Sequence, residues 1–228
     1  MCSHYTALKE AERLEKYFRV RGLPPPRTDM WPRYQGVFVR RPPHWDVGDD
    51  AVPEREAVTG RWGLISAQTR PDNAARAQKL ATFNARAESA AKSFTFGNAW
   101  RKGQRCIIPA EALFEPDWRS GKAVATRFIR ADGAPLGIAG LWDTWRAPGG
   151  EWVESYTMLT INADDHPLFR LYHRPGDEKR MVVILRDDVY EDWLTASAPA
   201  TASFLRPYPA EALIAQPMLQ TAVGGKED

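Results

Sequence analysis

The sequence of 228 residues contains only two cysteines, Cys2 and Cys106. So few cysteines exclude a zinc site built from several of them and argue against a disulfide framework. No apolar run approaches the ~20 residues that cross a bilayer, and no N-terminal pattern of a secretion signal is present. We therefore expect a cytoplasmic protein without membrane association. The sequence also has no internal repeat and no linker-like stretch, so we expect a single domain over residues 1–228.

The composition is that of a globular protein with an uneven distribution of charge. Hydrophobic residues make up 43% of the chain and charged residues 26%, which is enough to build a sizeable core. The formal net charge is only +2, yet residues 76–130 hold 11 Lys and Arg against 4 Asp and Glu. A basic central third favours a polyanionic partner over a small neutral substrate. The alternative is solvated charge scattered over several faces.

Local patterns predict one N-terminal helix and many strands. Residues 7–21 carry apolar side chains at helical spacing, with Thr6 as N-cap and Gly22 just beyond the end. Residues 44–60 are acidic and rich in turn formers, which predicts a surface loop, and the Ala-rich stretch 74–92 is helix-prone. Apolar runs predict strands at residues 34–41, 106–114, 122–130, 134–145, 154–162 and 181–185.

These elements together favour an α+β fold. The turn sequence at residues 131–133 predicts a hairpin between the strands 122–130 and 134–145. Short helical segments are expected at 166–172, 188–194 and 209–215. A mostly antiparallel sheet, curled like a barrel and flanked by peripheral helices, is the architecture that accounts for this order.

The N-terminus carries a distinctive reactive group. The small side chain of Cys2 permits removal of Met1, which would leave a free α-amine next to a β-thiol. Such an aminothiol captures an aldehyde by closing a thiazolidine ring, and both groups have reactive fractions near neutral pH because they titrate at ~7.7–8.0 and ~8.5. The alternative is that Cys2 is an ordinary residue in a frayed tail.

Three further stretches place polar groups at predicted strand ends or turns. Asn84 both donates and accepts hydrogen bonds, and Arg86 can bind a phosphate through its planar guanidinium. Glu115 follows a strongly apolar run, where burial would raise its pKa into a range suited to proton transfer. His173 precedes a buried strand and titrates near neutral pH. Each has a structural alternative: Asn84 could cap a helix, Glu115 could form an ion pair with a neighbouring arginine, and His173 could be a surface loop residue.

In this order and spacing, the stretches resemble the SOS-response-associated peptidase family, also called abasic-site processing or SRAP-domain proteins. The resemblance runs from Cys2 to about Trp193 and implies the SRAP fold. Its most specific parts are the second-position cysteine and the Asn-Ala-Arg-Ala-Glu string. The matching segments are MCSH (1–4), WGL (62–64), FNARAES (83–89), RCIIPAEALFEPDW (105–118), AGLWDTW (139–145), SYTMLT (155–160) and LYHRPGDEKRM (171–181).

The resemblance implies a protein that shields abasic sites in single-stranded DNA by a covalent thiazolidine crosslink, and it leaves a lyase activity open. It implies a monomer that needs no cofactor and no metal. The implied catalytic residues are the nucleophile Cys2, the positioning residue Asn84, the acid/base group Glu115 and the proton-transfer residue His173. The implied DNA-binding residues are His4, Trp62, Arg86 and Arg174.

The sequence departs from the family pattern at several positions. Ser3-His4 replaces Gly-Arg after the cysteine, the Pro-x-Trp that should follow Leu64 is missing, and residues 175–179 are inserted. Two other functions therefore stay open. One is a cysteine peptidase or amidase with an N-terminal nucleophile, which needs an oxyanion hole. The other is a non-catalytic single-strand binder that uses basic residues and some of the nine tryptophans for stacking.

Overall fold

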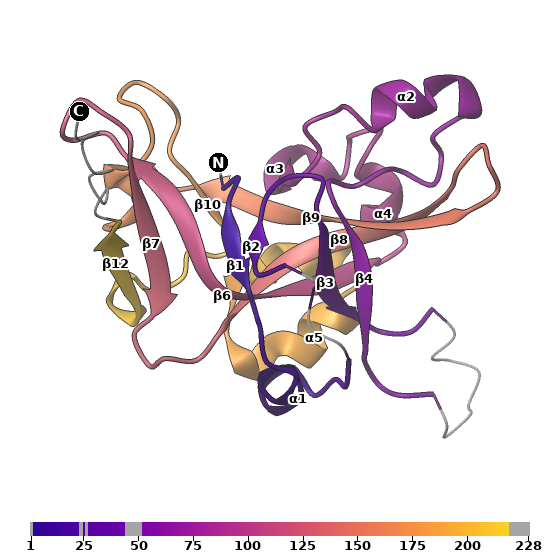
Figure 1. Ribbon diagram of the computed structural model, residues 1–228, viewed down its shortest axis with the longest axis horizontal. Coiled ribbons are helices and arrows are strands. Elements are labelled where there is room, and N and C mark those ends of the chain that lie inside the picture. Colours follow the sequence, from indigo (N-terminus) through magenta and orange to yellow (C-terminus); the bar gives the residue numbers. More distant parts are fainter. Residues whose placement is uncertain (1, 23–24, 26, 44–51, 219–228) are drawn as a thin grey trace, which may run out of the picture.

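The computed structural model describes residues 2–22, 25, 27–43 and 52–218, and a 12-stranded sheet is its main element (Figure 1). None of the helices within these ranges is long and apolar enough to span a membrane. The strands are β1 (Tyr5–Ala7), β2 (Asp29–Met30), β3 (Gln35–Arg40), β4 (Glu56–Trp62), β5 (Asn84–Arg86), β6 (Arg105–Asp117), β7 (Val124–Arg130), β8 (Leu136–Arg146), β9 (Trp152–Asn162), β10 (Arg180–Val182), β11 (Ile184–Leu185) and β12 (Leu213–Pro217). The helices are α1 (Ala11–Phe18), α2 (Ala74–Ala77), α3 (Ala87–Ala90), α4 (Gly97–Arg101) and α5 (Tyr190–Thr195), with short 3-10 turns η2 (Pro71–Asn73), η3 (Phe169–Leu171), η4 (Asp187–Val189), η5 (Pro199–Phe204) and η6 (Ala210–Ala212).

The sheet closes on itself and forms a barrel. Strands β8, β9, β4, β3 and β6 follow one another by hydrogen bonding, and β6 pairs back onto β8. The β4–β9 pair is parallel, whereas the other pairs of this ring are antiparallel. The predicted α+β fold with a curled, mostly antiparallel sheet is thus confirmed.

Two large apolar clusters fill the two sides of the sheet. One includes Phe38, Ile108, Phe128 and Tyr156 and lies against Cys2. The other joins α1 and α5 to the sheet; its members include Leu14, Phe18, Leu159 and Trp193. Strand β6 contributes to both clusters because alternate residues of a strand point to opposite faces. The long strand β6 therefore runs from the core to Glu115, which lies near its C-terminal end.

The N-terminal helix is shorter than predicted. It begins at Ala11, because residues 5–7 are drawn into strand β1, where Thr6 pairs with β2 and β6 instead of capping a helix. The left-handed residue that ends α1 is Arg19 (φ 57°), whose N–H donates to the carbonyl of Glu15, so Gly22 does not have that role. Pairing with distant strands outweighed the local helical pattern here.

Four other predictions were wrong for similar reasons. Part of the predicted loop 44–60 is strand β4, while residues 44–51 lie outside the described residues. Strand β5 interrupts the helix-prone stretch 74–92, and β12 replaces part of the helix expected at 209–215. The turn at 131–133 exists, but β7 and β8 do not form a hairpin. They pair with successive segments of β6 instead.

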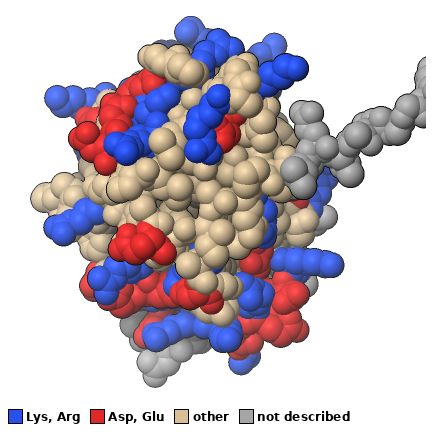
Figure 2. All heavy atoms as spheres, turned by 90° about the vertical axis from the view of Figure 1, so that its left-hand side faces the viewer, with Lys and Arg blue, Asp and Glu red and all other residues tan. Residues whose placement is uncertain are grey.

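Charges of both signs lie close together on the surface. Figure 2 shows one end of the molecule, where Lys and Arg side chains are interspersed with Asp and Glu above and below a broad uncharged band. Basic residues of the central third also form ion pairs, as Arg86 does with Glu178 and Arg130 with Asp187. The positive charge of residues 76–130 is therefore not one continuous face at this end.

Candidate active site around the N-terminus

Three strands and one loop bring the predicted catalytic residues together. Strand β1 pairs with β6, and Phe114 N–H donates to the carbonyl of His4 (3.1 Å), which places the N-terminus beside Glu115. Asn84 begins β5, and its Nδ2 donates to the carbonyl oxygen of Cys2 (2.6 Å). The loop after η3 brings His173 to the same place, where its N–H donates to Pro116 (3.0 Å). All four predicted residues thus meet around Cys2.

The Cys2 thiol is buried and protonated. Only 1% of the residue is exposed, and Sγ donates to the carbonyl of His4 (3.3 Å). Burial, followed by the nearby Glu115 carboxyl, raises the pKa of this thiol to about 12. The site therefore does not hold a preformed thiolate, and its sulfur needs a base that takes the proton as it reacts.

Glu115 and His173 form a buried acid/base pair. His173 Nδ1 lies 3.4 Å from Glu115 Oε2, and Nε2 lies 2.8 Å from the carbonyl oxygen of Arg180. Because a carbonyl only accepts, Nε2 carries the proton of the neutral ring and Nδ1 is the acceptor that faces Glu115. Burial raises the pKa of Glu115 to about 7 and lowers that of His173 to about 4. At neutral pH the ring is uncharged and the carboxyl is poised between its two forms.

The two polar atoms of the Asn84 side-chain amide differ in their contacts. Its side chain is buried, and Nδ2 is bound to Cys2, whereas Oδ1 has no hydrogen-bond partner within the described ranges. A buried acceptor without a partner is costly unless a ligand or another donor satisfies it. Oδ1 is thus suited to accept a hydrogen bond from the terminal amine or from a bound hydroxyl.

The inserted residues 175–179 form a loop that leaves His173 in the site. His173 has a left-handed backbone (φ 65°), a conformation that is uncommon for a residue with a side chain. Lys179 Nζ donates to the carbonyls of His173 (3.4 Å) and Arg174 (2.8 Å), which ties the loop back onto its own start. Gly176, also at positive φ (86°), makes the turn between them.

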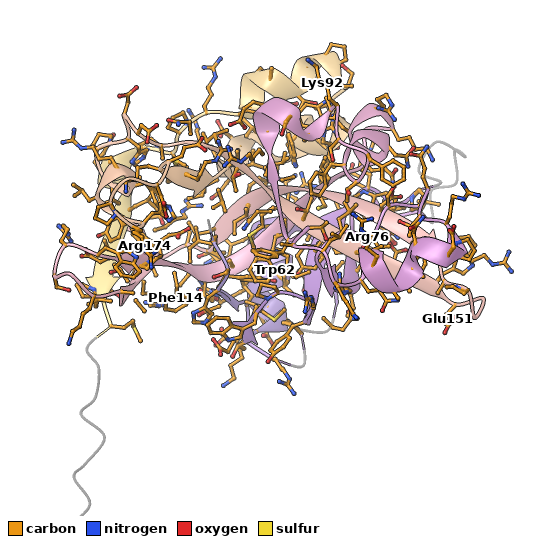
Figure 3. The ribbon with its side chains drawn as sticks, turned by 90° about the horizontal axis from the view of Figure 1, so that it is seen from above. Trp62, Arg76, Lys92, Phe114, Glu151 and Arg174 are labelled. Atoms are coloured by element: carbon orange, nitrogen blue, oxygen red, sulfur yellow. The ribbon has the colours of Figure 1, made fainter. Side chains whose placement is uncertain are left out.

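The predicted DNA-binding arginines lie at the surface near this loop. Arg86 is half exposed and its Nη1 lies 2.6 Å from Glu178 Oε2, a carboxylate of the insertion. Arg174 is exposed, with its guanidinium 4.9 Å from the ring centroid of Trp118. In the view from above, Arg174, Phe114, Trp62 and Arg76 follow one another across the molecule (Figure 3). Both predicted arginines can reach a ligand, although Arg86 must leave a carboxylate to do so.

The other two predicted DNA contacts differ from expectation. His4 stacks between Trp31 and Phe114, with ring centroids 4.3 Å and 4.0 Å away, and its Nε2 bonds Asp29. Trp62 is fully buried: its Nε1 donates to the carbonyl of Phe83 (3.0 Å), and its ring has no exposed face on which a base could stack. We therefore withdraw Trp62 as a DNA contact. A tryptophan in a strand is compatible with core or surface, and its sequence context did not distinguish them.

Sequence reasoning missed an ion-pair network beside the site. The Arg180 side chain is only 2% exposed and pairs with Glu88, with Nη2 at 2.9 Å from Oε2, and with Glu178, with Nη1 at 2.7 Å from Oε1. Nη2 also donates to the carbonyl of Thr160 (2.8 Å). This network fixes the carbonyl of Arg180 that orients the His173 ring. The sequence signal that could have indicated this network is the alternation of oppositely charged Arg86 and Glu88 at the end of one strand.

Known proteins resemble this chain in sequence and in fold. A family model described as SOS response associated peptidase (SRAP) matches residues 1–225. A crystal structure of a protein from Bordetella bronchiseptica is 62% identical, covers 95% of this chain and 99% of its own, and superposes with a TM-score of 0.88. A second structure, from Bacteroides thetaiotaomicron, is 21% identical with a TM-score of 0.75 and covers 96% of this chain and 93% of its own.

Two curated relatives carry functional names. Abasic site processing protein HMCES from Gallus gallus is 26% identical over 214 residues, which are 85% of this chain and 61% of the relative. Abasic site processing protein YoqW from Bacillus subtilis is 29% identical over 158 residues, 66% of this chain and 64% of the relative. The matched regions thus span less than two thirds of each of these relatives.

Proposed function

This chain belongs to the SOS response associated peptidase (SRAP) family, and we propose that it processes abasic sites in single-stranded DNA by forming a covalent crosslink through Cys2. The observation that carries the proposal is the hydrogen bond from Asn84 Nδ2 to the Cys2 carbonyl (2.6 Å), which fixes the N-terminus beside the Glu115–His173 pair. The names of the curated relatives supply the substrate. A monomer suffices, because one chain carries all four groups.

The chemistry needs a free amine on Cys2, so removal of Met1 comes first. The amine nitrogen then attacks the aldehyde carbon of the opened sugar, and water leaves with the aldehyde oxygen to give an imine. The thiol sulfur adds to the same carbon and its proton is transferred to the imine nitrogen, which closes the thiazolidine. The balance is aldehyde plus aminothiol giving thiazolidine plus water, with no redox step.

Glu115 is suited to both proton transfers. Its pKa of about 7 gives comparable fractions of acid and carboxylate at neutral pH. The acid protonates the departing oxygen, and the carboxylate then takes the proton from Sγ, whose own pKa is too high for unaided ionisation. The neutral His173 ring lies beside this carboxyl, with Nδ1 3.4 Å from Oε2, where it could exchange a proton with Glu115. Arg86 and Arg174 would contact phosphates of the strand.

An adduct assay tests the proposal with three variants. The protein is incubated with abasic and intact single-stranded oligonucleotides, and denaturation-resistant complexes are counted on a gel. We expect an adduct with abasic DNA only. Cys2→Ala should abolish the stable adduct, and an uncleaved N-terminal tag should do the same, because an amide nitrogen cannot close the ring. Cys106→Ala is the matched control: its buried side chain only packs, so capture should persist with a stability loss of ~1–2 kcal/mol.

The outcomes separate the alternatives. A stable adduct formed by the tagged protein or by Cys2→Ala would overturn the aminothiol mechanism. Cleavage of the strand accompanying adduct formation would add a lyase activity. Binding to intact and abasic strands alike without any adduct would favour a non-catalytic single-strand binder, and hydrolysis of peptides without DNA capture would favour the peptidase.

A further inference from the structure

A polar cavity of about 770 Å3 opens where strand β6 begins. It lies between the turn that follows α4 and the loop that follows α5; a Cβ atom at Gly103 of the turn would be 3.8 Å from the carbonyl oxygen of Ala196 in the loop. Arg105, the first residue of β6, lines the cavity, whereas Glu115 lies near the other end of the same strand, roughly 30 Å away along the strand. None of the roles described above involves this cavity.

The cavity wall carries positive charge without an acidic counterpart. Its basic residues are Arg41, Arg101, Lys102 and Arg105, and none of its described lining residues is Asp or Glu. Within the part of the chain that the structure describes, Arg101, Lys102 and Arg105 take part in no ion pair. Clustered cations without carboxylates favour an anionic ligand.

Arg105 differs from the other basic residues of the wall because it is almost completely buried. It is 1% exposed, and its Nη2 donates to the carbonyl of Trp100 (3.1 Å) and to Thr201 Oγ1, while Nε and Nη1 have no hydrogen-bond partner among the described residues. A buried charge without a counter-ion is costly unless a ligand compensates it. The other buried arginines of the described chain each pair with at least one carboxylate: Arg40, Arg55, Arg130 and Arg180.

The surroundings of Arg105 hold its guanidinium in place and leave it charged. The carbon of the guanidinium lies 5.0 Å from the ring centroid of Trp100 and 5.6 Å from that of Trp193, within the range of cation–π contacts. Burial lowers the pKa of Arg105 to about 10, which is still well above neutral pH. Because little solvent screens a charge in such surroundings, it acts strongly on an anion in the adjoining cavity.

The groups near the wall that would repel an anion are already bound by donors of the protein. The carbonyl of Trp100, near the C-terminal end of α4, accepts from Gly103 N–H (3.3 Å) besides the guanidinium. The carboxylate of Asp143, which Gln104 Nε2 contacts (3.3 Å), also accepts from Ala67 N–H (2.8 Å). These contacts reduce the negative charge that an entering anion would meet.

We propose that this cavity binds a phosphate-class oxyanion, carried by a small molecule or by a nucleic-acid strand. Three positive groups without a carboxylate require a ligand with more than one negative charge, which a phosphate group supplies. Arg101 and Lys102, both exposed at the rim, would donate to its oxygens, and Arg105 would act through its charge from behind the wall. The volume lies within the ~300–1,000 Å3 of small-molecule sites, so it leaves room for the group that carries the phosphate. The proposal depends neither on Cys2 nor on abasic DNA.

Binding of inorganic pyrophosphate tests the proposal. Its dissociation constant is measured by isothermal titration calorimetry on the complete chain at constant ionic strength, for wild type, Lys102→Ala and Lys122→Ala. Lys122 is the matched control, because it is also an exposed lysine but lies between β6 and β7, whereas Lys102 precedes β6. Arg101→Ala and Arg105→Gln complete the set.

We expect one saturable site in wild type. Lys102→Ala and Arg101→Ala should each weaken binding at least ~10-fold, the usual effect of losing a hydrogen bond between charged groups, while Lys122→Ala should bind as wild type. Arg105→Gln should weaken binding too, because it removes the buried charge. If Arg105→Gln does not fold, the two variants at the exposed rim decide the question.

Competition identifies the molecule that carries the phosphate. Displacement of pyrophosphate by an intact single-stranded oligonucleotide whose own affinity falls in Lys102→Ala would support the site and assign it to strand phosphates. Pyrophosphate binding that the oligonucleotide leaves unchanged would support a site for a free small molecule.

Three results would overturn the proposal. The first is the absence of saturable pyrophosphate binding. The second is binding that Lys102→Ala and Arg101→Ala leave unchanged, which would place the anion elsewhere on the protein. The third is an equal loss in Lys102→Ala and Lys122→Ala, which would indicate non-specific attraction to positive charge. Failure of the Cys2 adduct would leave all of these measurements intact.

Discussion

Replacing Glu115 by glutamine should slow capture and, at the same time, stabilise the protein at higher pH. Burial raises the pKa of the Glu115 carboxyl from 4.5 to about 7. Between these two values the folded protein keeps a proton that the unfolded chain has released. Because the folded state binds more protons in this range, the Glu115 contribution to stability is full below pH 4.5 and is lost as pH rises to about 7.

The magnitude follows from the two pKa values. A difference of about 2.5 units corresponds to ~3 kcal/mol, since one unit is ~1.4 kcal/mol. His173 acts in the opposite direction: burial lowers its pKa from 6.5 to about 4, so its contribution is full above pH 6.5 and is lost as pH falls to about 4. The two contributions largely cancel in wild type. In Glu115→Gln only the His173 term remains, so the free energy of unfolding of the variant should gain ~3 kcal/mol over wild type between pH 4 and pH 8.

Urea unfolding at pH 4, 6 and 8 measures this difference, and single-turnover adduct formation at pH 7 measures the rate. We expect Glu115→Gln to form the adduct ~10²-fold more slowly or worse, the usual effect of losing a general acid/base group. Glu111→Gln is the control, because Glu111 lies on the same strand but pairs with Arg13 (2.9 Å), away from Cys2. A variant that is slower and yet more stable cannot be explained by misfolding.

Two results would refute this reasoning. If the stability difference between Glu115→Gln and wild type were the same at pH 4 and pH 8, the carboxyl would not titrate near 7 in the folded protein. If the variant formed the adduct at the wild-type rate, Glu115 would not transfer a proton in the slow step.

The ion pairs next to the site allow two further predictions. Glu178→Gln removes the carboxylate 2.6 Å from Arg86, so single-stranded DNA should bind more tightly, with a log–log salt slope steeper by ~0.7, one phosphate contact; an unchanged slope would show that Arg86 does not contact the strand. Glu88→Gln removes one partner of the nearly buried Arg180, so urea unfolding should show a loss on the order of 1 kcal/mol, limited because Glu88 is half exposed and solvent screens the pair. No loss would mean that Glu178 alone suffices.

The sequence predicted the strands better than their partners. Apolar runs located β3, β6, β8 and β9, because strands that are buried in the core consist of apolar residues that are close together in the sequence. The turn at 131–133 was also found, but local sequence contains no information on which distant strand each arm pairs with. Strand β5 was missed because the alanines in and around it favour helix. Its three residues pair with β9, and this pairing overrides the helical preference.

The candidate site was predictable to the extent that its chemistry is intrinsic to residue types. The proposed reactivity of Cys2 follows from its position, and Asn84, Glu115 and His173 were identified as polar groups at strand ends. What the sequence could not provide was the exposure of the aromatic side chains. Trp62 was expected at the surface and is in the core, while Phe94 was not singled out and is 72% exposed. Exposure depends on the complete fold, so stacking surfaces are harder to predict than nucleophiles.

The buried centre of the site and its exposed rim differ in charge. At the centre, the Cys2 thiol, the Asn84 amide and the His173 ring are all uncharged at neutral pH, and Glu115 is only partly ionised. A low-charge centre avoids the cost of burying ions without partners, and it lets protons move between groups of similar affinity. Under the proposed function, attraction of the DNA strand would depend on exposed arginines such as Arg86 and Arg174, whose charges solvent can screen. The proposed function thus assigns binding and chemistry to separate side chains, so that substitutions at the rim and at the centre can be interpreted independently.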